Sequence, residues 1–385
     1  MIKCPHCQQV DAINRAGILR GKQRYFCKTC QVHFSTPSEL AIRPSPNHQV
    51  TIVDIARQLG ISKSTVSRAL RGQTDIHPGT RQAILDVAHE LDYQPNQLAY
   101  SLAKSKTNTI GVLIPELVSS FFPKVLVSIQ QSLRQAGYNV LICQSDESYE
   151  TEVDNARILL ANRVDGLIVS HTKETRNFEH LKIFQRKGIP VVFFNRVCED
   201  MVVPNVTVDD YRGAFEAVEH LIQNGYQRIA HLSGPDTLPN SRNRLNGYRH
   251  ALRQYNIPLD PDLIISYDLT LTKVNIYINH LLNLPQPPDA LFAMNDPTAI
   301  EALKVCRSRG VRVPHDLAIV GFSNDPASPL IEPSLTTVAQ PTSDIGYHAV
   351  RLLLNQLTGQ VESIPESVIL PAELLIRSST AKRFN

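Results

Sequence analysis

The segment from Thr51 to Leu70, TIVDIARQLGISKSTVSRAL, constrains the fold most strongly, because its spacing predicts two short helices joined by a tight turn. Thr51 and Asp54 form a capping-box-like start of the first helix, and apolar residues then recur at helical spacing on one side. Gly60 is suited to end that helix, and Ser62 is suited to cap the second. Together these signals predict a helix-turn-helix.

The second of these helices is expected to have one buried side and one polar side. Its buried side is predicted to contain Val66, Ala69 and Leu70. The opposite side carries Lys63, Ser64, Ser67 and Arg68. A polar side of this kind is either a solvated surface or a face that reads base edges in DNA.

The charge of the chain is unevenly distributed along its 385 residues. Residues 1–108 carry 14 Lys and Arg against 7 Asp and Glu, whereas residues 109–385 carry 25 against 29. The basic end is therefore the expected nucleic-acid end. The first ten residues do not resemble a signal peptide, and no apolar run is long enough to span a bilayer, so we expect a cytoplasmic protein without a membrane partner.

Four of the seven cysteines lie near the N-terminus in two closely spaced pairs. The pairs are Cys4 with Cys7 and Cys27 with Cys30. This spacing predicts one structural Zn²⁺ bound by four thiolates, with redox-active thiols as the alternative. His6 and His33 lie nearby and could substitute, but four cysteines already fill the site. Cys143, Cys198 and Cys306 are expected to be core residues.

The segment GKQRYFCKTCQVHF, residues 21–34, resembles the small zinc ribbon at the N-terminus of some bacterial transposase-associated proteins. We assign residues 1–36 to this ribbon. Asp11 is the one acid before Glu39, and it stands against five cations: Arg15, Arg20, Lys22, Arg24 and Lys28. The basic surface either contacts DNA phosphates, docks a protein or is idle.

Three further segments follow from local signals in the sequence. Residues 37–49 are rich in Pro, Ser and Asn and predict an extended linker. A third helix is expected over residues 79–91, which completes a headpiece over residues 50–95. Pro95 then precedes a short amphipathic helix within residues 96–108, which is too short to be stable alone.

From residue 51 to about residue 380 the chain resembles the LacI/GalR family of bacterial transcription regulators. The resemblance implies that residues 96–108 form a hinge helix, in which Leu102 inserts into the minor groove and Ala99 lies where the groove or a partner helix approaches closely. It places Lys63, Ser64 and Arg68 against base edges in the major groove. The positions implied for phosphate contacts are Thr51, Ser62, Thr65, Ser67 and Asn96. The N-terminal ribbon departs from the family's pattern.

Residues 109–385 alternate short apolar runs with helical segments, which is typical of parallel sheets covered by helices. The segment is long for one sheet and divides near Asp209 into similar halves. We therefore expect a multi-domain fold class: a small zinc ribbon, an all-α headpiece with a hinge helix, and an α/β core of two Rossmann-like lobes resembling periplasmic binding proteins. A ligand cleft is expected between the carboxyl ends of the strands of the two lobes.

The family resemblance adds connectivity and site residues to this core. It implies a first lobe over about residues 109–208 and 342–369 and a second over about 209–341 and 370–385. The motifs that carry it are SRNRLNGY at 241–248, AMND at 293–296, GFSND at 321–325 and PSLTTV at 333–338. The implied effector-binding residues are Phe121, Asn195, Arg244, Asn295, Asp296, Ser323 and Asn324. A neutral sugar, a sugar phosphate and a sugar acid all remain open as ligands.

These patterns favour a DNA-binding regulator over an enzyme, since the sequence contains no GxGxxG, GxxxxGK[ST], GxSxG or HExxH motif. We expect a homodimeric transcription regulator, and specifically a repressor, that binds a pseudo-palindromic operator. A small ligand, a sugar or a sugar derivative, is expected to control its affinity for that operator. The alternatives are a two-lobed solute-binding transport receptor and a transposition accessory protein that binds DNA.

Overall fold

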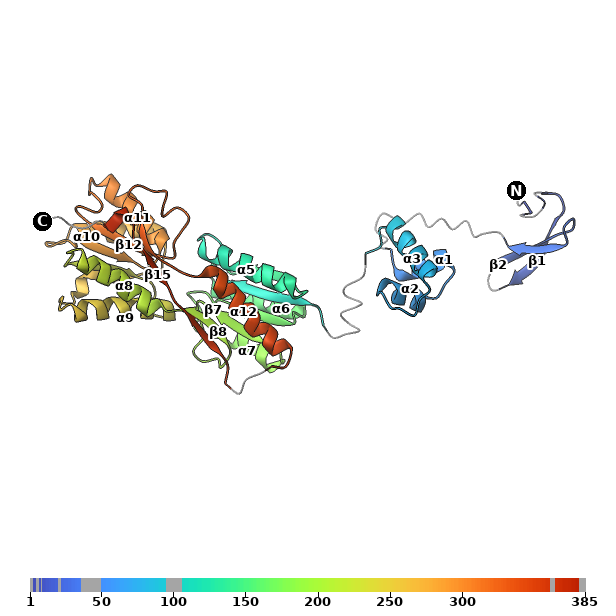
Figure 1. The fold of residues 1–385 in the computed structure, drawn as a ribbon, viewed down its shortest axis with the longest axis horizontal. Helices are drawn as coiled ribbons and strands as arrows, with labels where there is room; N and C mark the ends of the chain where they lie inside the picture. The colour runs from blue at the N-terminus through green and yellow to red at the C-terminus, as the bar shows by residue number, and fades with distance from the viewer. Residues whose placement is uncertain are drawn as a thin grey trace. The chain divides into compact units, whose positions relative to one another are not determined.

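The computed structural model describes residues 3–4, 7, 9–19, 22–35, 50–94, 106–360 and 364–380, and the chain divides into two compact units, Met1–Gln97 and Leu98–Asn385 (Figure 1). The predicted linker at 37–49 and nearly all of the predicted hinge helix fall outside the described residues. Asn96, Ala99, Leu102 and His6 are among those not described. Their predicted roles therefore stay predictions.

The N-terminal module is a three-stranded antiparallel sheet in the order β1-β2-β3. Its strands are β1 (Ile13–Leu19), β2 (Lys22–Cys27) and β3 (Val32–Ser35). The backbone N–H of Lys28 donates to the carbonyl of Ala12 at 2.8 Å, which ties the turn after β2 to the residues before β1. The small sheet agrees with the predicted ribbon.

The headpiece consists of three short helices around one apolar cluster. The helices are α1 (Ile52–Leu59), α2 (Lys63–Leu70) and α3 (Pro78–Glu90). Gly60 has a φ of 67°, a left-handed conformation that glycine adopts without strain, and it ends α1. Ile55, Val66 and Ile84 contribute one fully buried side chain from each helix. The predicted helix-turn-helix is confirmed.

The first lobe is a six-stranded parallel sheet in the order β14-β8-β7-β6-β4-β5. Its strands are β4 (Thr109–Ile114), β5 (Asn139–Gln144), β6 (Gly166–Val169), β7 (Val191–Phe194), β8 (Asn205–Val208) and β14 (Ser367–Leu370). The helices α5 (Phe121–Gln135) and α12 (Thr342–Leu357) pack on one face, and α6 (Tyr149–Ala161) and α7 (Glu179–Arg186) pack on the other. Val112 and Leu113 alternate between the two clusters as strand residues should.

The second lobe repeats this three-layer plan with the strand order β10-β9-β11-β12-β13-β15. Its strands are β9 (Ile229–Ser233), β10 (Ile264–Ser266), β11 (Ala290–Ala293), β12 (Ala318–Phe322), β13 (Thr336–Ala339) and the antiparallel β15 (Glu373–Leu375). The helices α8 (Asp210–Gln223) and α9 (Pro239–Gln254) cover one face, and α10 (Leu271–Leu282) and α11 (Asp296–Ser308) cover the other. Two short 3₁₀ helices, η1 (Pro261–Leu263) and η2 (Ser378–Thr380), complete it.

The chain passes between the lobes three times. It leaves the first lobe after β8, returns with α12 and crosses again between β14 and β15. The expected two-lobed α/β core is therefore confirmed. No helix among the described residues is both long enough and apolar enough to cross a membrane.

Candidate functional site

The first helix of the headpiece begins at a complete capping box. The Thr51 hydroxyl accepts from the N–H of Val53 at 3.2 Å, and the Thr51 N–H donates to the Asp54 carboxylate at 3.0 Å. The Asp54 carboxylate also forms an ion pair with Arg57, whose Nη1 lies 3.4 Å from Oδ1 of Asp54. The expected start of α1 is therefore held by both of its polar side chains.

The N-terminus of α2 carries a small cluster of hydroxyl groups. Ser62 caps the helix by accepting from the N–H of Thr65 at 3.1 Å. Its hydroxyl also lies 2.7 Å from that of Ser64 and 2.8 Å from that of Thr65. Ser62, Lys63 and Ser64 are exposed, so this end of the helix presents one cation and several hydroxyl groups to a partner.

Arg68 does not extend freely from α2. Its guanidinium donates to the Asp75 carboxylate at 2.7 Å, and its Nε is buried without a partner. Arg71 likewise donates to the Ser67 hydroxyl at 2.7 Å. The sequence interpretation predicted neither pair. Asp75 lies in the turn after the helix, outside the helical pattern that was used. Base reading by Arg68 stays a prediction and requires Arg68 to leave or share Asp75.

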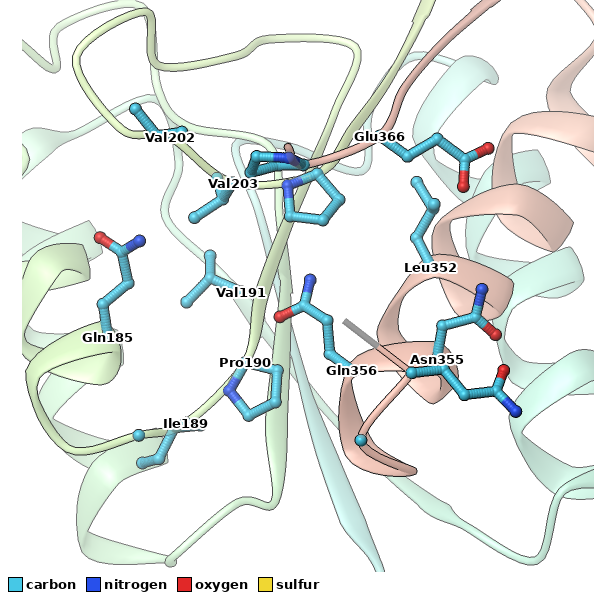
Figure 2. A pocket seen from close by; sticks show the side chains of 15 residues that line it. Gln185, Ile189, Pro190, Val191, Val202, Val203, Leu352, Asn355, Gln356 and Glu366 are labelled. Carbon is cyan, nitrogen blue, oxygen red and sulfur yellow. The ribbon is translucent and has the colours of Figure 1, made fainter. Parts of the chain in front are cut away.

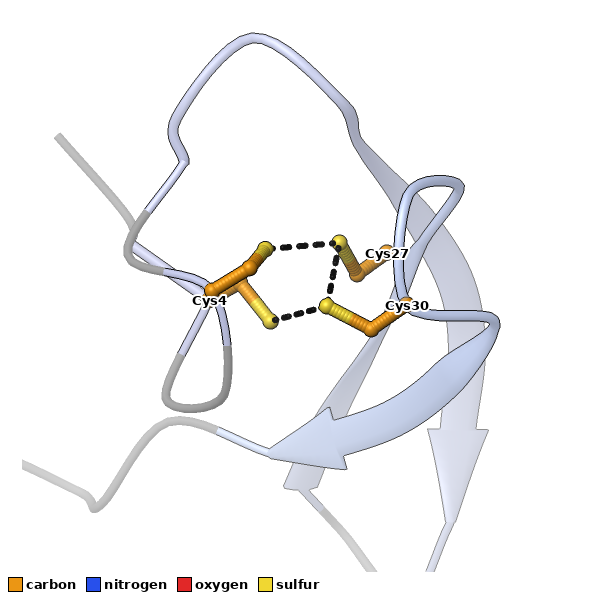
Figure 3. Close-up of side chains that lie close together, drawn as sticks. Cys4, Cys27 and Cys30 are labelled. Atoms are coloured by element: carbon orange, nitrogen blue, oxygen red, sulfur yellow. Dashed lines mark hydrogen bonds between the residues drawn. The ribbon is translucent and has the colours of Figure 1, made fainter.

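The four N-terminal cysteines come together (Figure 3). Their sulfur atoms all lie within 4.8 Å of one another, with Cys7 and Cys27 3.6 Å apart and Cys4 and Cys30 3.7 Å apart. A tetrahedron with Zn–S bonds of about 2.3 Å has S–S edges of about 3.8 Å. The donor set and spacing therefore fit a metal ion held by four thiolates.

Neighbouring groups affect these thiols differently. The backbone N–H of Cys30, with smaller help from Cys7, lowers the pKa of Cys27 to about 6, which favours the thiolate that a metal binds. Hydrogen bonding with Cys7, together with burial, raises the pKa of Cys30. His33 lies on β3, where its ring packs 4.8 Å from that of Phe26. Of the remaining cysteines, Cys198 and Cys306 are buried and Cys143 is half-buried, and burial raises the pKa of all three.

A cavity of about 490 Å³ lies between the lobes, where the strands of both sheets end. Its walls are formed by residues that follow β4, β5, β6 and β7 in the first lobe and β9, β10, β11, β12 and β13 in the second. The lining residues are Glu116, Val118, Ser119, Ser120, Phe121, Phe122, Asp146, Glu147, Lys173, Asn195, Arg196, Leu238, Asn240, Arg244, Leu269, Leu271, Met294, Asn295, Pro297, Ser323, Asp325 and Gln340. Five of the seven predicted effector residues are among them.

Arg244 lines this cavity but is itself a buried, paired side chain. Its Nε and Nη2 donate to Oδ1 of Asp210 at 2.8 and 2.7 Å, and its Nη1 donates to the carbonyl of Met294 at 2.6 Å. The guanidinium carbon also lies 3.6 Å from the centre of the Phe322 ring. These bonds use three of the five N–H groups of Arg244, and Nη1 also contacts the Met294 sulfur at 3.9 Å. Burial raises the pKa of Asp210, and Arg244 opposes that rise.

The two asparagines occupy different local structures at the cavity. Asn195 has a φ of 58°, a left-handed conformation that turns the chain sharply after β7. Asn295 caps α11 by accepting from the N–H of Thr298 at 2.9 Å. Ser323, with a φ of 122°, accepts from Gln340 at 3.0 Å. Ser323 thus lies in a strained turn directly at the cavity wall.

Asp296 and Asn324 are not among the lining residues of this cavity. Asp296 is fully buried and accepts from the Ser328 hydroxyl and from the backbone N–H of Asp325, both at 2.7 Å. The side chain of Asn324 accepts from Arg377 at 2.8 Å. Both residues therefore hold the loop after β12 in the structure, and direct ligand contact by them stays a prediction.

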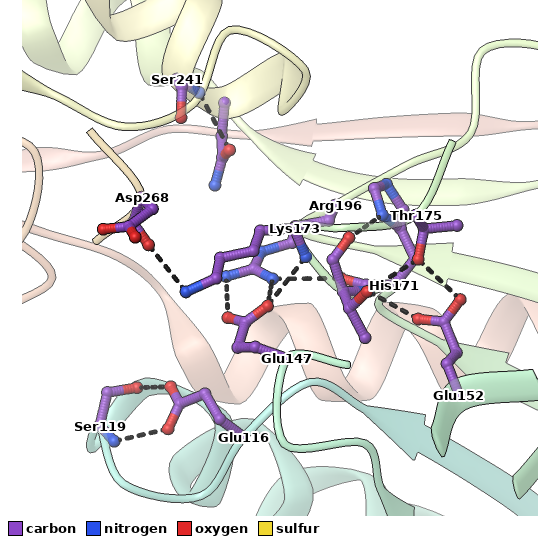
Figure 4. A network of polar contacts seen from close by, with 12 residues as sticks. Glu116, Ser119, Glu147, Glu152, His171, Lys173, Thr175, Arg196, Ser241 and Asp268 are labelled. Carbon is purple, nitrogen blue, oxygen red and sulfur yellow. Dashed lines mark hydrogen bonds and ion pairs between the residues drawn. The ribbon is translucent and has the colours of Figure 1, made fainter. Parts of the chain in front are cut away.

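The sequence interpretation missed a charged group on the first-lobe wall (Figure 4). Glu147 pairs with Arg196 through two contacts of 2.8 Å and accepts from the N–H of Lys173 at 2.8 Å. Burial alone would raise the pKa of Glu147, but Arg196 and Lys173 outweigh it and lower this pKa. Arg196 directly follows Asn195 at the end of β7, so the rule that ligands bind at strand ends points to it.

A buried network supports the loop that carries Lys173 (Figure 4). Glu152 is fully buried and accepts from the N–H of Thr172 at 2.6 Å, from the hydroxyl of Thr175 at 2.9 Å and from His180 at 2.7 Å. A buried carboxylate with this many donors fixes the loop geometry. The network thereby positions Lys173 at the cavity.

A second cavity, of about 700 Å³, lies at the opposite edge of the first-lobe sheet, beside the residues that precede β7, β8 and β14 (Figure 2). Its wall includes Val191, Val203 and Gln356. Its charged lining residue, Glu366, is paired with Arg351. None of the predicted site residues that the structure describes lines this cavity.

Comparison with known proteins identifies the family. Residues 51–96 match the family described as bacterial regulatory proteins, lacI family, and residues 218–380 match the periplasmic binding protein-like domain. Catabolite control protein A of Priestia megaterium is 33% identical over 333 residues, which cover 86% of this chain and 99% of that protein. The chain belongs to the LacI family of bacterial transcription regulators. It is not an enzyme, as predicted.

Other LacI-family relatives are similarly close. The HTH-type transcriptional repressor CytR of Escherichia coli K12 is 33% identical over 86% of this chain and 96% of its own. The lac repressor dimer bound to operator and the anti-inducer ONPF superposes with a TM-score of 0.77 at 27% identity, covering 86% of this chain and 99% of the other. The transcriptional regulator CelR in complex with cellobiose superposes with a TM-score of 0.66 at 28% identity, and the match covers 86% of this chain and 99% of the other. The chain is therefore a DNA-binding transcriptional regulator.

Proposed function

We propose that this regulator is a homodimeric repressor that acts in the cytoplasm. Its affinity for a pseudo-palindromic operator is set by an uncharged, hydroxyl-rich ligand in the cavity between the lobes. The composition of the cavity wall carries this proposal. Four carboxylates and three cations line it, so the wall offers no excess of positive charge for a phosphate or a sugar acid.

The polar groups that face the cavity suit hydroxyl groups. Asn195, Asn295 and Ser323 offer amide and hydroxyl groups, while Phe121 and Phe122 offer apolar surface for the faces of a sugar ring. Arg196 and Arg244 are largely occupied by Glu147 and Asp210. A neutral carbohydrate therefore fits better than a sugar phosphate. One relative agrees in kind, because its solved complex contains cellobiose.

DNA recognition is proposed through α2, with Lys63, Ser64 and Arg68 at base edges. Thr51, Ser62, Thr65 and Ser67 are proposed to contact phosphates. Dimerisation is supported by geometry, because one headpiece covers only one half-site of an operator. It is also supported by two exposed apolar side chains, Val127 on α5 and Tyr347 on α12, which are 54% and 55% exposed on helices that pack together. Ala99 and Leu102 keep their proposed hinge roles, and Asn96 is also proposed to contact a phosphate.

We also propose that Cys4, Cys7, Cys27 and Cys30 hold one structural zinc ion. Four protein ligands close a tetrahedral zinc site and leave no open position for a substrate, so the ion would stabilise the ribbon. The mutual sulfur distances of at most 4.8 Å support this assignment.

The test begins with selection of duplex DNA from random sequence by the purified chain, which is expected to yield a palindrome. Operator affinity is then measured with neutral mono- and disaccharides, nucleosides, sugar phosphates and sugar acids. We expect a neutral compound to change the affinity at least tenfold, about 1.4 kcal/mol of coupling. A response to phosphorylated or acidic compounds alone would refute the proposed ligand class.

Matched variants assign the two sites. Arg68→Ala is expected to lose about 1–3 kcal/mol of discrimination at one base pair, whereas Arg157→Ala, an exposed arginine on α6, should change nothing. Asn195→Ala is expected to weaken the response to the active compound about tenfold, while the exposed Asn162→Ala should not. Equal behaviour of Asn195→Ala and Asn162→Ala would remove Asn195 from the ligand site.

A further inference from the structure

The ribbon is a strongly basic module that the operator-binding helix does not explain. Residues 1–36 contain six Lys and Arg and one Asp, a net charge of +5. Four thiolates with one Zn²⁺ would add about −2, so the metal-loaded ribbon keeps about +3. Residues 109–385 carry a net −4. A compact, cationic module of this kind attracts a polyanion.

Three cations of the ribbon are available to a partner. Lys3, Arg15 and Lys28 are exposed, and within the described part of the chain none of them forms an ion pair. Some exposed arginines of the core are paired instead: Arg157 pairs with Asp154 at 2.8 Å, and Arg312 pairs with Asp316 at 2.7 Å. The charges of Lys3, Arg15 and Lys28 are thus available to a partner.

The ribbon holds two of these cations on a rigid frame. Arg15 on β1 pairs with Tyr25 on β2, which pairs with Phe34 on β3, so the three side chains share one face of the sheet. The Tyr25 and Phe34 rings lie 5.9 Å apart. Lys28 lies between Cys27 and Cys30, and its N–H is bonded to Ala12, three residues before Arg15. The cysteine cluster and the sheet together fix the backbone that carries Arg15 and Lys28.

We propose that the ribbon is a second DNA-binding module, which contacts phosphates of the duplex flanking the operator through Lys3, Arg15 and Lys28 and reads no bases. Duplex DNA is the polyanion already present, given that the headpiece binds an operator, and the inference rests on that proposed function. Each phosphate contact lowers the slope of log affinity against log salt concentration by about 0.9.

Chain length limits where the ribbon can bind. Fourteen residues separate Ser35 from Val50, the last and first described residues on either side. At no more than about 3.5 Å per residue they span at most about 50 Å, or about 15 base pairs. The contacts must therefore fall within this distance of the half-site.

The test compares two triple variants of the full chain that lose the same charge. The ribbon triple removes three of the ribbon's six cations, through Lys3→Gln, Arg15→Gln and Lys28→Gln. The control combines Arg249→Gln, Arg253→Gln and Arg307→Gln, three exposed arginines of the second lobe. Zinc content per chain is measured for both, and one zinc in each shows that the ribbon triple still forms its metal site.

Affinity for duplex DNA is measured between 50 and 300 mM salt on operators with flanks of 3 and of 20 base pairs. The wild type and the control are expected to gain affinity and a steeper salt slope on the longer flanks. The ribbon triple is expected to lose about 2.7 from the slope and about tenfold in affinity on long flanks, with little change on short ones.

Two outcomes would overturn the proposal. If the ribbon triple equals the wild type on both duplexes, the ribbon serves a protein partner or none, although operator selection by the wild type still stands. If both triples lose equally, the effect is one of overall charge. Should the wild type select no operator, the headpiece proposal fails, and the same salt slopes on random duplex still decide the role of the ribbon.

Discussion

His231 on β9 is a fully buried titratable side chain in the second lobe. Its ring stacks between Tyr248 at 5.2 Å and Phe292 at 4.6 Å, and its Nδ1 donates to the Phe292 carbonyl at 2.9 Å in the tautomer that satisfies that carbonyl. Its Nε2 is buried without a partner. Burial, together with the charge of nearby Arg244, lowers the pKa of His231 to about 4.

This shift predicts a pH dependence of stability. The folded state favours neutral His231, whereas the imidazole of the unfolded chain titrates near pH 6.5, so its contribution is complete above pH 6.5 and is lost as the pH falls towards 4. The loss amounts to about 3 kcal/mol. Urea unfolding between pH 4 and 8 should show this loss of stability in the wild type. The control variant His280→Gln, which replaces an exposed histidine, should show the same loss. His231→Phe should have a flatter profile, and parallel profiles would contradict the assignment.

At the scale of residues, motifs predicted which side chains line the cavity better than they predicted their partners. Asn195, Asn295 and Ser323 line it, because each lies within two residues of the end of a parallel strand. The partner of Arg244 is Asp210, 34 residues earlier, and such a pairing depends on how α8 and α9 pack together. Asp296 was expected near the ligand, but its environment is a buried loop that only the tertiary fold creates.

The capping box of α1 is the feature at the scale of elements that sequence predicted most completely. Thr51 and Asp54 exchange side-chain and backbone hydrogen bonds. Thr51→Ala is therefore expected to destabilise the headpiece by about 1 kcal/mol, and Thr51→Ser should retain most of the stability. Amide hydrogen exchange in α1 measures this. If alanine and serine accelerate exchange equally, the hydroxyl does not act as a cap.

Other elements show where local patterns stop being informative. The strands of the sheet centres, such as β4 and β11, are continuous buried apolar runs, and the alternation of apolar and helical segments predicted them. The edge strands β10 and β14 are only partly buried, so they lack such a run. The family motifs, and not periodicity, placed the last crossings. The third helix, expected over 79–91, spans Pro78–Glu90.

At the scale of the molecule, polar contacts across the cleft hold the two lobes together. Ser120 donates to Asp325 at 2.8 Å, Lys124 to the carbonyl of Asn324 at 3.1 Å and Lys173 to the carbonyl of Asp268 at 2.7 Å. Glu199 and Arg242 add an ion pair of 2.7 Å between the lobes. A ligand in the cavity acts on the same two surfaces, so it can bias the closed arrangement.

Lys173 offers a direct test of this closure, since its backbone is fixed by Glu147 while its ammonium reaches the second lobe. Lys173→Met keeps the apolar stem and removes the cross-lobe hydrogen bond. Because hydrogen bonds from charged groups contribute about 1.5–3 kcal/mol, amide exchange over residues 266–272 of the second lobe should accelerate about tenfold or more. Lys182→Met, whose lysine pairs with Glu179 within α7, should change nothing there. Unchanged exchange over residues 266–272 in Lys173→Met would show that this bond does not hold the lobes closed.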